Sequence, residues 1–171
     1  DRLLAEHRAA WADRWEAVDV RIPDDPQAQL AIRFALFQLW CNISRQGEAA
    51  VGARGLSGHA YSGHGFWDAD VFTLPAVVSM DPAMAKAMIR YRLRRLSAAR
   101  AAAQAGGRRG ARFPWEPVAN GHDVTPTVGH LGGQSVPILT GEREEHVTAD
   151  VAWALAHYAE WSGDRALLTG A

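Results

Sequence analysis

Apolar residues recur at helical spacing over most of the chain, and this periodicity constrains the fold more than any other feature. The segment 3–18 places its apolar residues on one face, which predicts an amphipathic helix. Acidic residues followed by proline at 24–26 predict the start of a second helix, over 27 to about 44. That segment is apolar nearly all round, so we expect a buried helix.

Two long glycine-rich loops, 45–69 and 107–142, interrupt the helical pattern. Helices are expected from about 70, from 81 to about 105, and from about 144 to 161. We see no convincing strand ladder and therefore expect an all-α fold. Loops this long inside a domain are usually functional, and we expect the two to converge on one face.

The helix predicted over 81–105 carries a stretch rich in arginine. We interpret these side chains as a solvated face, in preference to a phosphate site. They are Arg90, Arg92, Arg94, Arg95 and Arg100.

Composition narrows the class of protein. The 171 residues suffice for one domain, and a net charge of -1 argues against a nucleic-acid or anionic-membrane partner. The single cysteine, Cys41, excludes an internal disulfide. With no membrane-spanning run or signal peptide, we expect a cytoplasmic protein. The start at Asp1 and the stop at Ala171, within a new helical pattern, read as a piece of a longer chain.

The segment 58–70 combines glycines with aromatic rings and carboxylates. Phe66, Trp67, Asp68 and Asp70 crowd its exit. An indole can pack on the apolar face of a sugar, and a carboxylate accepts hydrogen bonds from hydroxyls. We favour a sugar-binding role over the alternative of a buried structural turn.

Three glutamates lie where the second loop meets the last helix, at Glu142, Glu144 and Glu145. The plain interpretation is that acids compensate the dipole at a helix N-terminus. Like charges close together also favour the protonated form of one member, as a general acid for glycosidic cleavage requires. Glu142 and Glu144 project differently from a helix, so only one is expected to face a pocket.

Other chemistries find no support in the motifs. The histidines show no paired metal-ligand spacing, and one cysteine excludes thiolate sites, so we expect no metal. No nucleophile elbow is present, and 52–58 matches neither a P-loop nor a dinucleotide fingerprint. His59 and His64 are interpreted as substrate-contacting or structural.

Three collinear motifs resemble glycoside hydrolase family 65. They are 53–58 with 63–70, then 110–116, then 144–155 with 162–164. That family contains inverting phosphorylases of trehalose, maltose and kojibiose, and some α-glucoside hydrolases. The resemblance implies an (α/α)6 barrel, with 1–19 as a linker helix and 20–171 as the N-terminal portion of the barrel. Half a toroid would leave the helix 27–44 partly uncovered.

The resemblance also implies an activity. We expect inverting cleavage of an α-glucosidic disaccharide of the trehalose, kojibiose or maltose type. Phosphorolysis would use inorganic phosphate as co-substrate, without a cofactor, and give β-glucose 1-phosphate. The alternatives are a trehalase-like inverting hydrolase and a non-catalytic sugar-binding fragment. A homo-oligomer is expected, with phosphate-binding residues or a catalytic base in the remainder of a longer chain.

Residue by residue, Trp67 and Asp68 match positions that hold the non-reducing glucose in the family. Glu144 is our candidate for the general acid and Glu142 the alternate, whereas His59 departs from the acidic residue expected there. We expect Trp67, Asp68 and Trp115 to line a common pocket. The full set of predicted substrate-binding residues is Arg54, His64, Phe66, Trp67, Asp68, Trp115 and Glu116.

Overall fold

The computed structural model describes residues 1–56, 58 and 60–169. Its contacts divide the chain into two units, Asp1–Cys41 and Asn42–Ala171. The division therefore falls near the end of the second helix. The expectation of a linker helix over 1–19 concerns a larger fold and stays a prediction.

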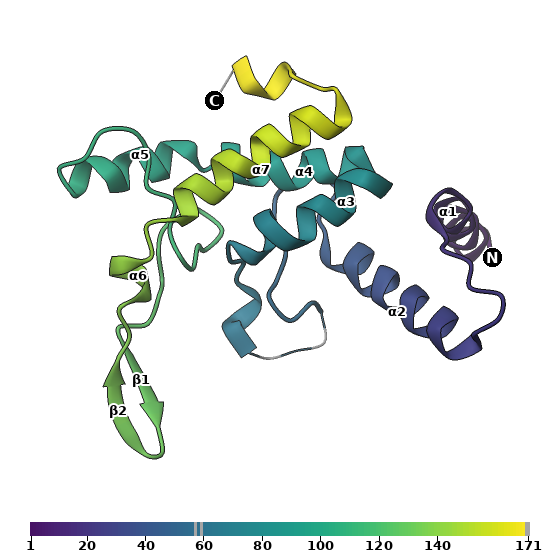
Figure 1. Ribbon diagram of the computed structural model, residues 1–171, viewed down its shortest axis with the longest axis horizontal. Coiled ribbons are helices and arrows are strands. Elements are labelled where there is room, and N and C mark those ends of the chain that lie inside the picture. The colour runs from purple at the N-terminus through teal and green to yellow at the C-terminus, as the bar shows by residue number, and fades with distance from the viewer. Residues whose placement is uncertain (57, 59, 170–171) are drawn as a thin grey trace. The chain divides into compact units, whose positions relative to one another are not determined.

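The first unit consists of α1 (Arg2–Val18) and most of α2 (Pro26–Asn42), drawn in purple and blue in Figure 1. Asp25 caps α2, because its Oδ1 accepts hydrogen bonds from the backbone N–H of Gln27 at 3.0 Å and of Ala28 at 2.9 Å. The acidic helix start expected from the sequence is thus confirmed. Arg33 of α2 pairs with Asp19 at 2.5 Å and ties the two helices together.

Aromatic rings form the contact between α1 and α2. Trp15 meets Trp40 edge-on at 4.9 Å between ring centroids, and Trp40 is buried. Other apolar side chains of α2 are exposed to solvent: Leu30 is 72% exposed and Phe34 is 61% exposed. The prediction that this helix is buried is wrong for these side chains, because an apolar helix is buried only where other elements cover each face.

The second unit is built on α3 (Leu74–Met80), α4 (Pro82–Leu93) and α7 (Val147–Ser162). Figure 1 shows α7 running beside α3 and α4, and the three pack against one another. A π-helix, η2 (Ala69–Thr73), leads into α3. The largest of the fully buried side chains are Leu74, Val77, Ile89, Val147 and Tyr158.

The single helix expected over 81–105 is broken into α4 and α5 (Leu96–Ala105). Its start is confirmed, since Asp81 accepts a hydrogen bond from the Met84 N–H at 3.0 Å. The break is at Arg95, whose backbone N–H bonds to Arg92 O at 3.0 Å. The Tyr91 carbonyl, which would accept the Arg95 backbone N–H in a regular helix, accepts a hydrogen bond from the Arg95 guanidinium at 2.9 Å. A side chain has replaced one helical hydrogen bond, which periodicity does not reveal.

A hairpin in the second loop corrects the prediction of an all-α chain without strands. β1 (Val128–Leu131) pairs antiparallel with β2 (Gln134–Pro137). Gly132 and Gly133 form the turn with φ of +57° and +80°. Two residues with positive φ make a type I′ turn, which suits the twist of a two-residue hairpin. The consecutive glycines Gly132 and Gly133 were the sequence signal from which this hairpin could have been predicted.

Short elements complete the described chain. They are η1 (Ala60–Gly63), α6 (Thr140–Arg143) and η3 (Ala166–Thr169). Within the described residues, no helix combines the length and the apolar character needed to span a bilayer.

Candidate functional site

The first loop folds back on itself and so fixes the point where it leaves toward η2. Gly52 and Gly65 form an isolated antiparallel bridge, and the Ala53 N–H donates to His64 O at 3.3 Å. The side-chain amide of Asn42 donates to Gly52 O at 2.8 Å. The loop exit, with Phe66 and Trp67, is therefore held by backbone contacts on both arms.

The second loop is anchored to helices at both ends. The backbone N–H of Arg112 donates to Ala99 O of α5 at 2.8 Å, and its guanidinium donates to Gly141 O at 2.6 Å. The Phe113 N–H donates to Thr148 Oγ1 of α7 at 3.0 Å. These bonds place Trp115 beside the start of α7.

Four rings from the two loops and the approach to α7 form an aromatic cluster: Phe66, Trp67, Trp115 and His146. The centroids of Trp67 and Trp115 lie 6.3 Å apart. His146 meets Trp67 edge-on, at 4.9 Å and 88°. Phe66 meets Trp115 at 6.2 Å. The expectation that the two loops converge is confirmed for these tryptophans.

Two carboxylates flank the imidazole of His146. Its Nδ1 lies 2.5 Å from Asp150 Oδ2, and its Nε2 lies 3.3 Å from Glu144 Oε2. A neutral imidazole donates a hydrogen from only one nitrogen. The contact with Asp150 is a hydrogen bond, whereas Glu144 lies within ion-pair distance of the ring. The imidazole thus places both carboxylates next to the aromatic cluster.

The three glutamates singled out in the sequence make different contacts. Glu144 reaches His146, whereas Glu145 pairs with Arg108. Glu142 lies on α6 with an exposed side chain. The last helix begins at Val147 and not at 144 as predicted, because Glu144 has the non-helical angles φ -82° and ψ 77°. Of the three, the structure brings Glu144 to the cluster.

The other predicted site residues are only partly brought together. His64 Nδ1 lies 2.8 Å from Oε1 of the buried Glu116, which links the two loops. Asp68 and Arg54 are exposed, and Asp68 makes no side-chain hydrogen bond to the described part of the chain. His59 lies outside the described residues.

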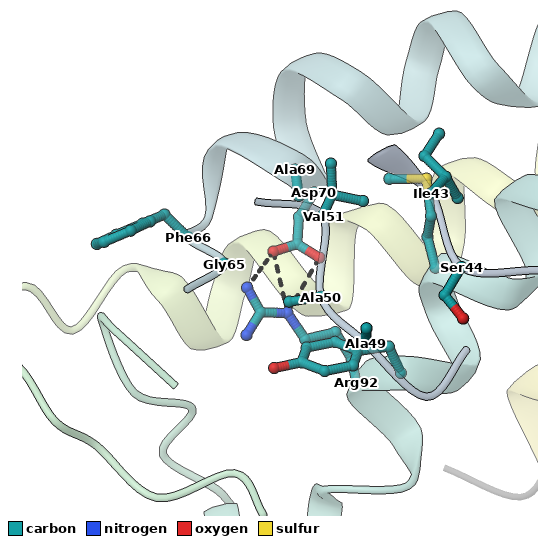
Figure 2. Close-up of a pocket in the computed structure, with 12 residues that line it drawn as sticks. Ile43, Ser44, Ala49, Ala50, Val51, Gly65, Phe66, Ala69, Asp70 and Arg92 are labelled. Carbon is teal, nitrogen blue, oxygen red and sulfur yellow. Dashed lines mark hydrogen bonds and ion pairs between the residues drawn. The ribbon is translucent and has the colours of Figure 1, made fainter. Parts of the chain in front are cut away.

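One predicted surface residue is in fact buried. Arg92 is 4% exposed and forms an ion pair with Asp70, 6% exposed, at 2.6 Å (Figure 2). Burial raises the pKa of the Asp70 carboxyl, and the guanidinium of Arg92 opposes that shift. The solvated-face prediction is therefore wrong here, although it holds for Arg90, Arg94 and Arg100, which are exposed.

Sequence reasoning missed Arg92, His146 and Asp150 as members of this region. Arg92 follows the buried Met88 by four positions on the same helix face, so its spacing was a usable signal. His146 and Asp150 are also four apart, the spacing that brings side chains together on a helix. In the described residues, no group of three or more His, Cys, Asp or Glu is placed to hold a metal ion.

The chain is similar in sequence to a family of glycosyl hydrolases. Residues 33–171 match the family model described as the glycosyl hydrolase family 65 central catalytic domain. A kojibiose phosphorylase of Halothermothrix orenii is 38% identical over 96% of this chain and 22% of its own length. A kojibiose hydrolase of Flavobacterium johnsoniae is 40% identical over 96% of this chain and 23% of its own.

A solved structure agrees with these relatives. A provisionally named kojibiose phosphorylase from the human microbiome superposes with a TM-score of 0.78 and 26% identity. The match covers 93% of this chain and 22% of that one. The chain thus spans about a fifth of the length of the proteins it resembles.

Proposed function

The chain belongs to glycosyl hydrolase family 65, and we propose that the full-length protein cleaves a kojibiose-type α-glucosidic disaccharide by phosphorolysis. The chain would supply the side chains that bind the glucose unit, Trp67, Trp115 and Asp68, which we call the glucose wall. A kojibiose phosphorylase with 38% identity supports this substrate class and reaction. The proposal includes inversion at the anomeric carbon, with β-glucose 1-phosphate and a free sugar as products.

The aromatic cluster beside Glu144 is the observation that carries the proposal. Trp67 and Trp115 are half-buried and pack in part against the core, and an indole can pack on the C–H face of a sugar ring. Asp68, exposed next to Trp67, has a carboxylate that can accept hydrogen bonds from hydroxyls. Glu144 is set beside the same cluster through its 3.3 Å contact with His146. The two indole rings, the Asp68 carboxylate and the proposed proton donor Glu144 thus lie in one region.

In the proposed mechanism, Glu144 protonates the glycosidic oxygen as the bond to the anomeric carbon breaks. Phosphate attacks that carbon from the opposite face, which inverts its configuration. His146 holds Glu144 in place and is itself oriented by Asp150 at 2.5 Å. The residues that bind phosphate are assigned to the remainder of the longer protein.

Hydrolysis is the second candidate, favoured by the kojibiose hydrolase at 40% identity. The same acid and glucose wall would serve both reactions, and only the attacking group differs. In a hydrolase, a carboxylate acting as general base would activate water on the face opposite the acid.

Turnover of kojibiose by the full-length protein, with and without inorganic phosphate, tests the proposal. We expect cleavage that depends on phosphate, with one β-glucose 1-phosphate formed per glucose released, and the anomer identified by proton NMR. Cleavage at the same rate without phosphate would establish the hydrolase. Absence of cleavage of kojibiose, trehalose and maltose under both conditions would refute both activities.

A further inference from the structure

The buried ion pair Asp70–Arg92 follows directly after the segment that presents Trp67 and Asp68. We propose that Arg92 is a positioning residue for glucose binding, acting through Asp70 on that segment. This inference rests on the proposed function, because it assigns Trp67 and Asp68 to the glucose unit. It adds a specificity-determining element outside the aromatic cluster, on a different helix.

The geometry of the pair fixes Asp70 in more than one direction. Arg92 Nε lies 3.2 Å and 3.1 Å from the two carboxylate oxygens, and Nη2 lies 2.6 Å from Oδ2. Figure 2 shows the guanidinium facing the carboxylate, with dashed lines to both oxygens. A fork of this kind constrains orientation more than a single point charge does.

Asp70 is in turn bonded to the carbonyl of Trp67. The backbone N–H groups of Asp70 and Val71 donate to Trp67 O at 2.9 Å and 3.1 Å, and the Ala69 N–H donates to Phe66 O at 3.2 Å. The turn that presents Trp67 and Asp68 is thus hydrogen-bonded to the residue that Arg92 holds. This turn opens the π-helix η2, a rare geometry that occurs frequently at functional sites.

The surroundings favour positioning over binding of a ligand by the pair itself. The cavity beside it, lined by Ala50, Phe66 and Met88 among others, has a volume of about 20 Å³. That is room for about one water molecule and not for a sugar ring. A buried ion pair also adds little net stability, because desolvation offsets the attraction between the charges. Orientation of the segment is the contribution that remains.

The test compares two ion pairs that share helix α4. In the full-length protein, Asp70→Asn, Arg92→Gln and the double variant are set against Asp164→Asn, Lys86→Gln and their double variant. Lys86 pairs with Asp164 at 2.5 Å without contacting the glucose-presenting turn. For each variant, the Kd for glucose is measured by calorimetry, together with KM for disaccharide and for phosphate, and Tm.

We expect Asp70→Asn and Arg92→Gln to weaken glucose binding and raise the disaccharide KM by about tenfold or more, since small misplacements of positioning groups have large effects. The phosphate KM should not change. The double variant should lose no more than the worse single variant, because the two residues act as a unit. Lys86→Gln and Asp164→Asn should lower Tm and leave glucose binding unchanged.

Arg92→Lys separates charge from geometry. It keeps the positive charge and loses the fork, so Tm should recover relative to Arg92→Gln while glucose affinity should not. Unchanged glucose affinity in folded Arg92→Lys and Asp70→Asn would overturn the proposal, as would equal losses in the Lys86–Asp164 variants. A wild-type protein that binds glucose without cleaving any α-glucoside would refute the proposed function, and the glucose measurements would still test Arg92.

Discussion

At the scale of single residues, experiment can distinguish whether Glu144 donates a proton or only binds the substrate. In the full-length protein, Glu144→Gln should abolish cleavage of kojibiose and retain far more activity on a substrate with an activated leaving group. The reason is that a good leaving group needs no protonation. The measurement is kcat/KM on both substrates.

Glu142→Gln is the matched control, because Glu142 lies two residues away with an exposed side chain. Equal losses on both substrates in Glu144→Gln, with Glu142→Gln fully active, would make Glu144 a binding residue and move the general acid outside residues 1–171. Loss confined to the Glu142 variant would mean that the proposed acid is misassigned between the two glutamates.

The exposed carboxylate next to Trp67 gives a second prediction. Asp68→Ala should weaken glucose binding by the value of a hydrogen bond to a charged group, about 1.5–3 kcal/mol. Tm should change little, because Asp68 is exposed and contacts no described side chain by a hydrogen bond. Calorimetry with glucose and a thermal melt check this. A large fall in Tm with intact affinity would show that Asp68 is structural.

The type of a residue and its sequence neighbours were a good guide to which aromatic side chains come together. They were a poor guide to burial, which depends on contacts with residues distant in the sequence. Trp67 and Trp115 stand out beside glycines, and the structure brings them to 6.3 Å. Arg92 was assigned to solvent because arginines in a run usually are solvated. Its burial depends on Asp70, 22 residues away, which no local pattern reveals.

At the scale of elements, one ion pair ties the segment after α7 to α4. Asp164 Oδ2 lies 2.5 Å from Lys86 Nζ and accepts a hydrogen bond from the Tyr158 hydroxyl at 3.0 Å. The hydrogen bond from Lys86, with one from the Ala166 N–H, lowers the pKa of Asp164 from 3.8 to about 2. A carboxyl with a lowered pKa stabilises the fold above its unfolded pKa, and that stabilisation is lost as pH falls.

Asp164→Asn should therefore flatten the dependence of Tm on pH between about 4 and 2, relative to the wild type. Thermal melts of the full-length protein at closely spaced pH values would show it. Asp81→Asn is a control, since an asparagine also caps a helix and Asp81 contacts no cation among the described residues. Identical wild-type and Asp164→Asn curves across this window would contradict the assignment.

Helix starts could be predicted because capping is local: Asp25 and Asp81 each bond to N–H groups two or three residues ahead. The break at Arg95 could not, because it depends on a guanidinium that takes a helical carbonyl and also reaches Glu48 O at 2.7 Å. The hairpin was missed for another reason. Its strands read Val-Gly-His-Leu and Gln-Ser-Val-Pro, which lack the strict apolar–polar alternation that marks a strand.

At the scale of the whole molecule, the fold was predictable mainly by resemblance. Periodicity gives helices and loops but not their arrangement. The match of residues 33–171 to the family model and a TM-score of 0.78 supply the relation to the catalytic domain. The closed (α/α)6 barrel itself stays a prediction.

The last prediction concerns catalysis by the 171-residue chain alone, which we expect to have no useful turnover. Inverting cleavage needs an attacking group held on the face of the sugar opposite the acid. In the described residues, both carboxylates that flank His146 belong to the approach to α7 or to α7 itself. Both contact the same imidazole, so we expect neither to activate an attack from the opposite face of the sugar.

Purified chain and full-length protein should be compared on kojibiose, with and without phosphate, at equal molar concentration. Glucose binding by calorimetry is measured in parallel, because the chain carries the proposed glucose wall. We expect glucose binding without turnover from the chain, and both from the full-length protein. Phosphate-dependent release of glucose by the chain alone would place the whole catalytic machinery within residues 1–171 and refute the division of labour proposed above.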